Sequence, residues 1–392
     1  MEWNERVPMA VNDIRILLLA LTGAYFMYLL AERLLASSRR NRLEHVVHVN
    51  GTRGKSAVTR LIAAGLQAGG VKACAKTTGT VPVFLTVSGE EQKIRRLGPA
   101  NIREQLWALR AAAGQKAQVL AAECMAVDPA LQKLTQRQML RADIGVITNV
   151  RPDHPQEMGG TLEAVCDALS GTIPEGGQLF TAERALFDRL AQNARAHRAA
   201  ILQCLPAPKE EAEFKKIDFP ENVALALAVC GALGVDRETA LCGMRTLYRR
   251  DPYALSYHLL PGGALFVNAM AANDITSTGT ILADALGRED AGLKRLTLVL
   301  NNRADRASRT GQMIQWTAEV RPRAVYLMGA SGPWAARRLR ALGLEHVFCT
   351  TATRLDLCAF GEDDLVFAAG NIAGEGILLM RRVEKEGSLL VR

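Results

Sequence analysis

The 392-residue sequence predicts an α/β protein with a P-loop parallel-sheet domain and a smaller C-terminal Rossmann-like α/β domain, preceded by an N-terminal membrane helix. Three observations support this fold class. Apolar segments of strand length alternate with helical patterns along most of the chain. Hydrophobic residues make up 49% of the sequence and aromatic residues 5%, a balance that suits parallel sheets covered by helices. A glycine-containing turn at 51–54 joins the first predicted strand of the globular part to a helix.

The N-terminus is the most apolar part of the chain. Residues 16–31 carry no charge, and Arg15 and Arg33 flank this stretch, where their side chains could reach the two membrane interfaces. Further arginines follow at 39, 40 and 42, so the positive-inside rule places the rest of the chain in the cytoplasm. We therefore expect residues 1–40 to form a single-pass anchor in the cell membrane, with a buried or amphipathic helix as the alternative.

Two series of elements follow the anchor. The first has predicted strands at 45–50, 71–75, 116–123, 142–150, 178–181 and 200–204, and helices at 57–68, 129–140, 182–196, 222–233 and 237–249. The second has strands at 264–269, 296–300, 324–328, 346–349 and 365–368, and helices at 278–286, 312–320 and 334–341. The short charged stretch 206–214 is predicted to be a connection. We place the boundary near residue 250, which gives domains at 41–250 and 251–392.

The charge balance limits the partners. The formal net charge of +8 favours anionic partners such as nucleotides, acidic lipids or a polyanionic product. We see no nucleic-acid motif and expect no nucleic-acid binding. The eight cysteines form no C-x-x-C pair and are interpreted as reduced residues of a cytosolic protein.

The segment V-N-G-T-R-G-K-S at 49–56 is the most informative motif. It lies between a strand and a helix, as in a P-loop, where backbone N–H groups hold phosphates, a lysine meets the β- and γ-phosphates, and a serine hydroxyl meets Mg²⁺. It departs from the usual spacing, since Val49 stands where the first glycine belongs and an additional glycine occupies 51. The motif predicts ATP and Mg²⁺ binding by Gly51, Thr52, Arg53, Gly54, Lys55, Ser56 and Ala57.

Polar residues at other strand ends extend this site. Glu123 ends an apolar run, where its carboxylate would lie beside the P-loop and could hold Mg²⁺ together with Ser56. The segment at 76–80, K-T-T-G-T, could help to shape the phosphate or acceptor site, the alternative being an ordinary loop. In the second series, Arg303, Asp305 and Arg306 follow a strand and could contact phosphate, carboxylate or ribose, although turn formation explains an Asp there equally well.

Several of these segments resemble the Mur ligase superfamily, whose members join carboxylates to amines through acyl phosphates. V-N-G-T-x-G-K-S is similar to its ATP loop, and T-N-V-R-P-D-H at 148–154 is similar to a segment whose histidine helps to bind a divalent metal. The resemblance therefore implies that His154 is a metal ligand with Ser56 and Glu123, the alternative being a solvated loop histidine. Asn222 matches a helix start at which an asparagine reads adenine, but it could equally be an N-cap. The carbamylated lysine of many Mur ligases has no assignable counterpart, and the corresponding region offers Glu183 and Arg184.

Read together, the membrane segment and motifs such as FAAGNIAGEG at 367–376 resemble the ligase subunits of bacterial poly-γ-glutamate synthases. The resemblance implies an ADP-forming ligase that joins the γ-carboxylate of glutamate to another glutamate, with Lys55, Glu123 and His154 as catalytic residues. It also implies glutamate and the poly-γ-glutamate chain as ligands, membrane-embedded partner subunits and a homo-oligomer. Another Mur-type ligase, such as a folylpolyglutamate synthase, and a transporter ATPase subunit remain alternatives.

Overall fold

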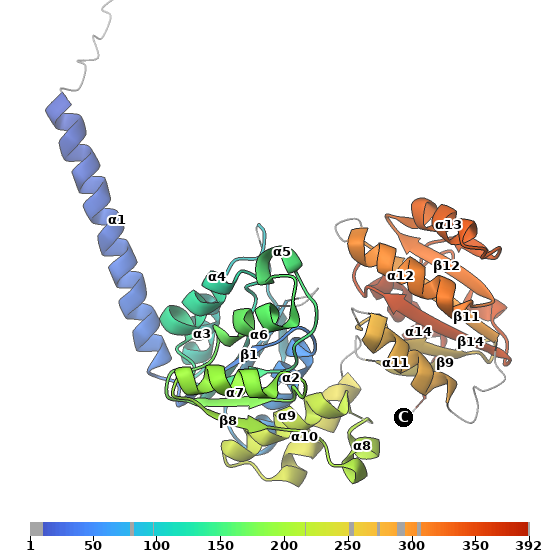
Figure 1. The fold of residues 1–392 in the computed structure, drawn as a ribbon, viewed down its shortest axis with the longest axis horizontal. Helices are drawn as coiled ribbons and strands as arrows, with labels where there is room; N and C mark the ends of the chain where they lie inside the picture. The colour runs from blue at the N-terminus through green and yellow to red at the C-terminus, as the bar shows by residue number, and fades with distance from the viewer. Residues whose placement is uncertain are drawn as a thin grey trace, which may run out of the picture. The chain divides into compact units, whose positions relative to one another are not determined.

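The structure is a computed structural model that describes residues 11–78, 82–96, 98–215, 217–250, 255–272, 275–287, 295–303 and 307–390. The chain divides into two compact units, residues 1–244 and 245–392 (Figure 1). The division falls within helix α10 (Arg237–Arg250). The domain bounds drawn from the sequence, at residues 40 and 250, stay predictions.

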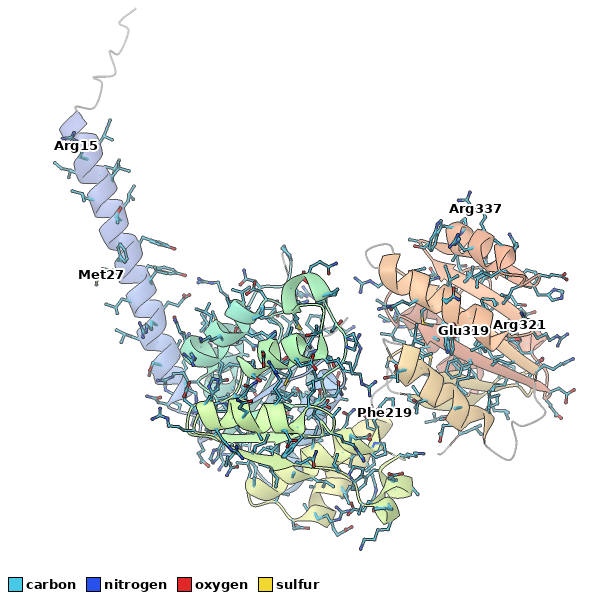
Figure 2. All side chains as sticks on the ribbon, in the orientation of Figure 1. Arg15, Met27, Phe219, Glu319, Arg321 and Arg337 are labelled. Carbon is cyan, nitrogen blue, oxygen red and sulfur yellow. The ribbon has the colours of Figure 1, made fainter. Side chains whose placement is uncertain are left out.

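The N-terminal helix α1 (Val11–Arg40) is longer than the uncharged stretch that predicted it. Within the described residues it is the one helix that is long and apolar enough to cross a membrane, over Ile14–Arg40. Figure 2 shows its side chains projecting around the helix, with Arg15 and Met27 labelled. Most of the large apolar side chains between residues 14 and 35 are exposed, as they would be in a helix that crosses a membrane.

Unit 1 is built on an eight-stranded sheet in the order β4-β3-β2-β5-β1-β6-β7-β8. The pairs from β2 to β8 are parallel, while β3 and β4 form an antiparallel edge on β2. Its strands are β1 (His45–Asn50), β2 (Ala73–Lys76), β3 (Val83–Leu85), β4 (Glu91–Lys93), β5 (Val119–Glu123), β6 (Ile144–Ile147), β7 (Gln178–Thr181) and β8 (Ala200–Gln203). β1 lies inside the sheet, paired with β5 on one side and β6 on the other, and its residues 46–50 are buried, as expected of a strand whose two faces are both covered.

Helices cover both faces of this sheet (Figure 1). The helices described in this unit are α2 (Lys55–Ala68), α3 (Glu104–Gly114), α4 (Pro129–Leu134), the π-helix η1 (Thr135–Leu140), α5 (Pro155–Met158), α6 (Leu162–Ser170), α7 (Phe187–Ala196), α8 (Pro208–Phe214), α9 (Pro220–Ala232) and α10. Two predictions were wrong in detail. Residues 129–140 change from an α-helix to a π-helix, and the connection predicted at 206–214 contains α8, whose first turn carries Pro208 and Glu210 as helix-start residues.

Unit 2 contains a seven-stranded sheet in the order β13-β12-β11-β14-β10-β9-β15. Its strands are β9 (Ser256–Leu259), β10 (Leu265–Asn268), β11 (Arg295–Asn302), β12 (Ala324–Gly329), β13 (Val347–Cys349), β14 (Asp364–Gly370) and β15 (Ser388–Leu390). The pairs from β13 to β10 are parallel, and β9 pairs antiparallel with β10 and β15. The predicted α/β class, with two largely parallel sheets, is confirmed.

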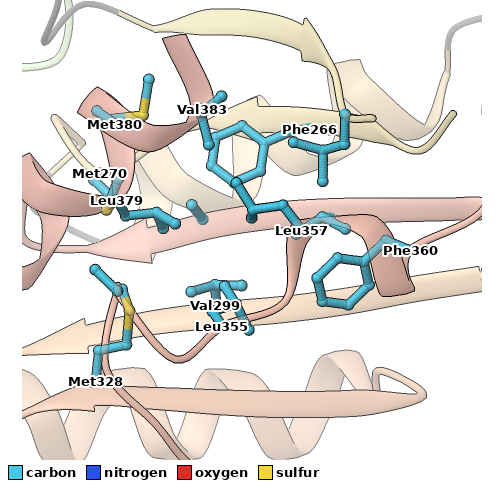
Figure 3. Close-up of a cluster of buried hydrophobic side chains, with 14 of the residues drawn as sticks. Phe266, Met270, Val299, Met328, Leu355, Leu357, Phe360, Leu379, Met380 and Val383 are labelled. Carbon is cyan, nitrogen blue, oxygen red and sulfur yellow. The ribbon is translucent and has the colours of Figure 1, made fainter. Parts of the chain in front are cut away.

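The helices of unit 2 are α11 (Ile275–Leu286), α12 (Ala307–Val320), α13 (Gly332–Ala341), the 3-10 helix η2 (Leu357–Ala359) and α14 (Glu375–Glu386). One face of the sheet packs against α14 and the segment around η2, where Phe266, Val299 and Leu379 meet Leu357 and Phe360 (Figure 3). The buried side chains hold the central strands β11 and β14 together, and the chain leaves both strands at the same edge of the sheet.

Candidate active site

The turn between β1 and α2 is shaped by two glycines with left-handed backbone angles. Gly51 has φ 126° and Gly54 has φ 82°, a region that side-chain-bearing residues rarely adopt. Space demands glycine as well, because a Cβ atom on Gly51 would lie 2.0 Å from Thr148 Oγ1. The turn therefore directs the first backbone N–H groups of α2 toward the edge of the sheet where phosphates would bind.

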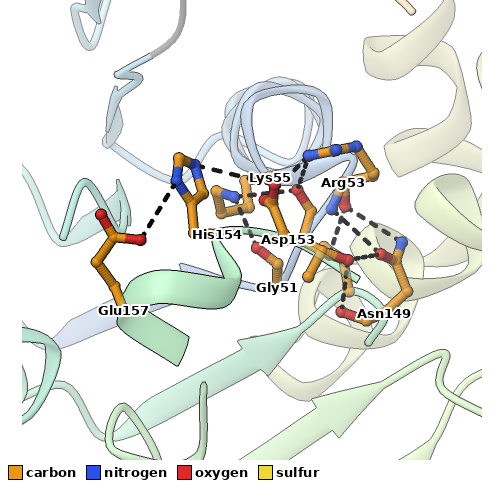
Figure 4. A network of polar contacts seen from close by, with 9 residues as sticks. Gly51, Arg53, Lys55, Asn149, Asp153, His154 and Glu157 are labelled. Atoms are coloured by element: carbon orange, nitrogen blue, oxygen red, sulfur yellow. Dashed lines mark hydrogen bonds and ion pairs between the residues drawn. The ribbon is translucent and has the colours of Figure 1, made fainter. Parts of the chain in front are cut away.

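Lys55 and Ser56 begin α2 and point to different partners. Lys55 Nζ donates to the Gly51 carbonyl at 2.6 Å and to the Thr52 carbonyl at 3.3 Å, so its charge lies over the turn (Figure 4). Ser56 Oγ donates to Glu123 Oε2 at 2.8 Å. The pairing of Val49 on β1 with Glu123 on β5 explains this contact, since parallel neighbours end at the same edge.

Glu123 is buried, and its carboxylate is held from two sides. Its Oε2 also accepts a hydrogen bond from the Thr78 backbone N–H at 2.7 Å, so the loop after β2 closes on the same oxygen that Ser56 contacts. The other carboxylate oxygen has no hydrogen bond recorded among the described residues. A hydroxyl and a carboxylate together are the oxygen donors that a hard divalent cation takes.

The segment after β6 is hydrogen-bonded to the turn between β1 and α2. Asn149 Oδ1 accepts hydrogen bonds from Thr52 Oγ1 at 2.7 Å and from Arg53 N at 3.1 Å, while its Nδ2 donates to the Arg53 carbonyl at 3.2 Å (Figure 4). Thr148 Oγ1 donates to the same carbonyl at 2.5 Å. Thr148 and Asn149 belong to the motif at 148–154, but their role in holding the turn could not be read from its spacing.

The candidate metal ligand His154 lies in the loop that follows. Arg53 Nη1 forms an ion pair with Asp153 Oδ2 at 3.1 Å, which connects this loop to the turn. His154 is half-exposed, with Nε2 3.9 Å from Asp153 Oδ1 and Nδ1 3.9 Å from Glu157 Oε2. Across the described ranges no group of three His, Cys, Asp or Glu residues is close enough to hold a metal ion. The structure thus brings Ser56 and Glu123 together, while a metal role for His154 stays a prediction.

Asn222 lies beside the turn, in the first turn of α9. The N-cap of α9 is Phe219, so Asn222 does not cap this helix. Its Nδ2 donates to Asp218 Oδ1 at 2.6 Å, and its Oδ1 is so close to the turn that a Cβ on Gly54 would lie 2.5 Å away. This buried amide therefore lies next to the turn between β1 and α2. Its recognition of adenine stays a prediction.

The Glu183 carboxylate accepts hydrogen bonds from backbone N–H groups of two segments. Its Oε2 accepts from Val150 N at 2.7 Å, and its Oε1 accepts from Ala185 N at 2.8 Å and Leu186 N at 3.2 Å. The buried carboxylate thus fixes the segment that leads to His154 and keeps residues 182–186 out of α7. This explains why the helix predicted from residue 182 begins only at Phe187.

Lys76 is a fully buried cation at the end of β2. Its Nζ lies 3.4 Å from Glu104 Oε2, and Arg96 holds that carboxylate through two hydrogen bonds of 2.6 and 3.1 Å. Burial lowers the pKa of Lys76, while the charges of Glu104 and Glu123 oppose that shift. The segment at 76–78 therefore packs against the site, and Gly79 and Thr80 lie outside the described residues.

In unit 2, Arg303 follows β11 and lines a small hollow at the edge where β11 and β14 end. The other lining residues are Asn301, Asn302, Thr310, Met313, Gly370 and Asn371. Asn301 Nδ2 donates to the carbonyls of Asn371 and, at 2.8 Å, Ala373, which ties the two strand ends together. Asp305 and Arg306 lie outside the described residues, so their predicted ligand contacts stay predictions.

Two known protein families match separate parts of this chain. The Mur ligase middle domain family matches residues 49–176, which contain the glycine turn, Glu123 and the loop of His154. A second family, described as the poly-gamma-glutamate synthase CapB C-terminal domain, matches residues 257–386 of unit 2. The chain is therefore built from a Mur ligase type of central domain and a C-terminal domain known from polymer synthases.

Two curated relatives identify the family. The PGA synthase CapB of Bacillus subtilis (strain 168) is 37% identical over 279 residues, which are 68% of this chain and 69% of the relative. The capsule biosynthesis protein CapB of Bacillus anthracis is 39% identical over 285 residues, which are 70% of this chain and 60% of the relative. The chain belongs to the poly-gamma-glutamate synthase CapB family, which confirms the resemblance seen in the sequence.

Solved structures with a similar fold come from folylpolyglutamate synthases. E. coli FolC in complex with ADP matches with a TM-score of 0.65 and 15% identity, over 93% of this chain and 96% of FolC. The folylpolyglutamate synthase of Thermotoga maritima matches with a TM-score of 0.61 and 13% identity, over 93% and 96% of the two chains. At these identities the likeness concerns the fold alone.

Proposed function

We propose that this protein is an ATP-dependent, ADP-forming ligase that joins glutamate units through their γ-carboxylates to make poly-γ-glutamate. The observation that carries the proposal is the joint placement of Lys55, Ser56 and Glu123 around one glycine turn, in a chain whose relatives are named as a capsule biosynthesis protein and a PGA synthase. The alignment spans 60% of the first of these relatives, so the activity rests on the site as well as on the family.

The chemistry needs an activated carboxyl group, because a carboxylate is a poor electrophile at neutral pH. A γ-carboxylate oxygen attacks the γ-phosphorus of ATP, the bond to the β-phosphate oxygen breaks, and ADP leaves. The amine nitrogen of a second glutamate then attacks the acyl carbon, the carbon–oxygen bond to phosphate breaks, and the amine loses a proton. One ADP and one phosphate are released for each amide formed.

The residues of the turn fit this reaction. The α2 amides and Lys55 would bind the phosphates, once the Nζ atom exchanges its two carbonyl partners for phosphate oxygens. Ser56 Oγ and Glu123 form the oxygen donor set that suits Mg²⁺, which supplies charge neutralisation when bound. His154 would complete that set, Asn222 would contact adenine, and Arg303, Asp305 and Arg306 would contact the nucleotide or an acidic substrate.

The location and partners belong to the same proposal. Helix α1 would anchor the chain once in the cell membrane, with residues 41–250 and 251–392 as cytoplasmic ATP-binding and C-terminal domains. The ligands would be glutamate and the growing poly-γ-glutamate chain, which the positive net charge suits. Membrane-embedded partner subunits would receive the polymer, and the chain would act as a homo-oligomer.

Product analysis tests the proposal. With ATP, Mg²⁺, glutamate and membrane partners, we expect one ADP and one phosphate per γ-linked bond, and hydroxylamine should trap the activated carboxyl group as a hydroxamate. Formation of AMP, or ADP release that does not depend on glutamate or polymer, would contradict the acyl-phosphate route and favour the transporter ATPase. Because the fold is shared with folylpolyglutamate synthases, a reduced folate serves as the control acceptor, and its extension with glutamate would favour that alternative.

A further inference from the structure

The outer face of α3 carries an exposed tryptophan between two exposed arginines. Arg103, Trp107 and Arg110 follow the spacing i, i+4, i+7, so they lie on one face of the helix and its N-terminal flank. The opposite face of α3, with Ala108, Leu109 and Ala112, packs into the core of unit 1. On the exposed face, the two arginines are not part of this core, and Trp107 contacts it through Phe84.

This face lies beside the membrane helix. Arg103 Nη2 forms an ion pair with Glu32 Oε1 and donates to the Tyr28 hydroxyl at 3.1 Å (Figure 1 shows α3 next to the C-terminal end of α1). Glu32 is the first charged residue after the uncharged stretch 16–31 and so marks where α1 leaves the hydrocarbon region of a membrane. The N-terminal end of α3 is thereby placed at the level of the lipid headgroups.

Trp107 has the position and surroundings of an interfacial tryptophan. Its ring packs edge-to-face against Phe84, with 5.3 Å between the ring centroids, while 42% of the residue remains exposed. The packing against Phe84 orders one side of the indole and leaves the other uncovered. Tryptophan is enriched at membrane interfaces because an apolar ring carries a polar N–H.

An arginine from a distant part of the sequence lies against the base of α1. Arg141 Nη2 donates to Asn41 Oδ1 at 2.8 Å, and the Arg141 carbonyl accepts from Arg40 Nε at 3.0 Å, although 100 residues separate 41 from 141. We use the name basic collar for Arg39, Arg42, Arg103, Arg110 and Arg141. Folding thus brings Arg103 and Arg141 to the C-terminal part of α1, where Arg39 and Arg42 already follow in sequence.

We propose that the basic collar and Trp107 form a docking surface for the headgroups of anionic lipids next to the anchor. Cationic side chains close to a bilayer are attracted by anionic lipids, and the indole ring inserts at the interface. Docking would fix the orientation of unit 1 on the membrane, whereas α1 alone would fix only its position. The proposal rests on the membrane anchoring proposed above.

Fluorescence quenching in nanodiscs tests this surface with the full chain. The protein has four tryptophans, and replacing Trp3, Trp316 and Trp334 with Phe leaves Trp107 as the only one. Brominated lipids should quench Trp107, and adding phosphatidylglycerol to phosphatidylcholine discs should increase the quenching by roughly twofold. A variant that keeps only the buried Trp316 is the control and should remain unquenched in both kinds of disc.

Two charge variants make the test specific. Arg110→Glu should return the quenching of Trp107 to its level in neutral discs, whereas Arg354→Glu, an exposed charge of unit 2, should leave it unchanged. Trp107 that stays unquenched in anionic discs, while γ-glutamyl product still forms, would overturn the docking surface and spare the proposed function. A chain that fails to enter the discs would overturn the docking surface and the anchor together.

Discussion

The hydroxyl of Ser56 lies 2.8 Å from Glu123 Oε2, which joins the first turn of α2 to the end of β5 across the sheet edge. The two residues are 67 positions apart, and only the parallel pairing of β1 with β5 brings them together. The backbone N–H of Thr78 reaches the same carboxylate oxygen. Three segments thus meet at one carboxylate, and it is at this carboxylate that we propose a divalent cation binds beside the phosphates.

Replacing Glu123 with Gln should raise the Mg²⁺ concentration needed for half-maximal ADP release by about tenfold, the equivalent of ~1.4 kcal/mol in metal binding. The amide keeps an acceptor oxygen for Ser56 and Thr78, so the fold should hold while the charge is lost. Titration of activity with Mg²⁺ measures the effect. Glu175→Gln, which removes an exposed carboxylate paired with Arg137, is the control, and equal titrations for both variants would remove Glu123 from the metal site.

Replacing Lys55 with Ala should lower the rate of glutamate-dependent ADP release by about a hundredfold or more, because loss of a transition-state charge contact costs ~2.7 to 4 kcal/mol. The Lys55 ammonium contacts only the carbonyls of the turn among its recorded hydrogen bonds in the described part of the chain, so thermal unfolding should change little. Lys72→Ala, at an exposed site of the same unit, should keep the full rate. Retention of more than about a tenth of the rate by Lys55→Ala would argue against the P-loop interpretation.

Asn149→Ala should weaken ATP binding without touching a phosphate contact. The variant removes the three hydrogen bonds to Thr52 and Arg53, and the turn would then be less ordered before ATP binds. We expect the KM for ATP to rise by about tenfold, while the midpoint of thermal unfolding falls by only a few degrees, as for the loss of ~1 to 3 kcal/mol in a half-buried cluster. A fall in kcat at unchanged KM would show instead that Asn149 acts on the reaction itself.

The sequence predicted those parts of the fold that have a local cause. The strand and glycine-containing turn at 45–54 were predicted because apolar patterning and the strand–turn–helix order are local features, whereas the contact with Thr148 that requires Gly51 was not visible in the sequence. The short hairpin of β3 and β4 was missed, since strands of three residues carry too little periodicity to be recognised. Helices α3 and α14 were also missed, although each is a continuous helix of 11 or 12 residues.

The sequence predicted which residues belong to the candidate site, but it did not predict most of the hydrogen bonds between them. Ser56 and Glu123 could be paired from the rule that parallel strands end at one edge, and the structure places them in contact. Asn149 accepts a hydrogen bond from Arg53 N, and Glu183 accepts one from Val150 N. Both contacts depend on the registers of β6 and β7, which one sequence does not specify. The burial of Lys76 was not predictable either, because nothing in the sequence distinguishes it from an exposed loop lysine.

His48 should make the stability of unit 1 depend on pH. Burial lowers the pKa of His48 to about 4, with a hydrogen bond from its Nδ1 to Gln136 Oε1 of 2.8 Å opposing the shift. The unfolded chain therefore binds a proton at this residue below its ordinary pKa of ~6.5, while the folded chain does so only near 4, so the free energy of unfolding falls as the pH decreases between these values.

We expect His48 to account for a loss of about 2 kcal/mol between pH 7 and pH 5. Urea unfolding of the wild type and of His48→Asn, which keeps a donor for Gln136, measures the difference at the two pH values. The variant should lose less stability than the wild type on acidification. Parallel losses in the two proteins would mean that other groups cause the pH dependence.

The point of truncation at the N-terminus should decide whether unit 1 remains stable. Arg40 belongs to α1 but contacts the globular part, where its Nη2 lies 2.8 Å from Asp143 Oδ1 and its Nη1 donates to the Leu43 carbonyl at 3.1 Å. Deleting residues 1–36 keeps these contacts, whereas deleting residues 1–43 removes Arg40 and the buried Leu43 and leaves Asp143 without its guanidinium partner.

We therefore expect the shorter deletion to release a folded, nucleotide-binding protein from membranes, and the longer one to cost ~2 to 4 kcal/mol of stability. Sedimentation of membranes and thermal unfolding of the two variants measure these effects. Any membrane binding left after the shorter deletion should come from the basic collar and should disappear at about 1 M salt, since screening is then almost complete within a few ångströms. Binding that resists salt would show that a partner or an apolar surface, rather than α1, holds the protein at the membrane.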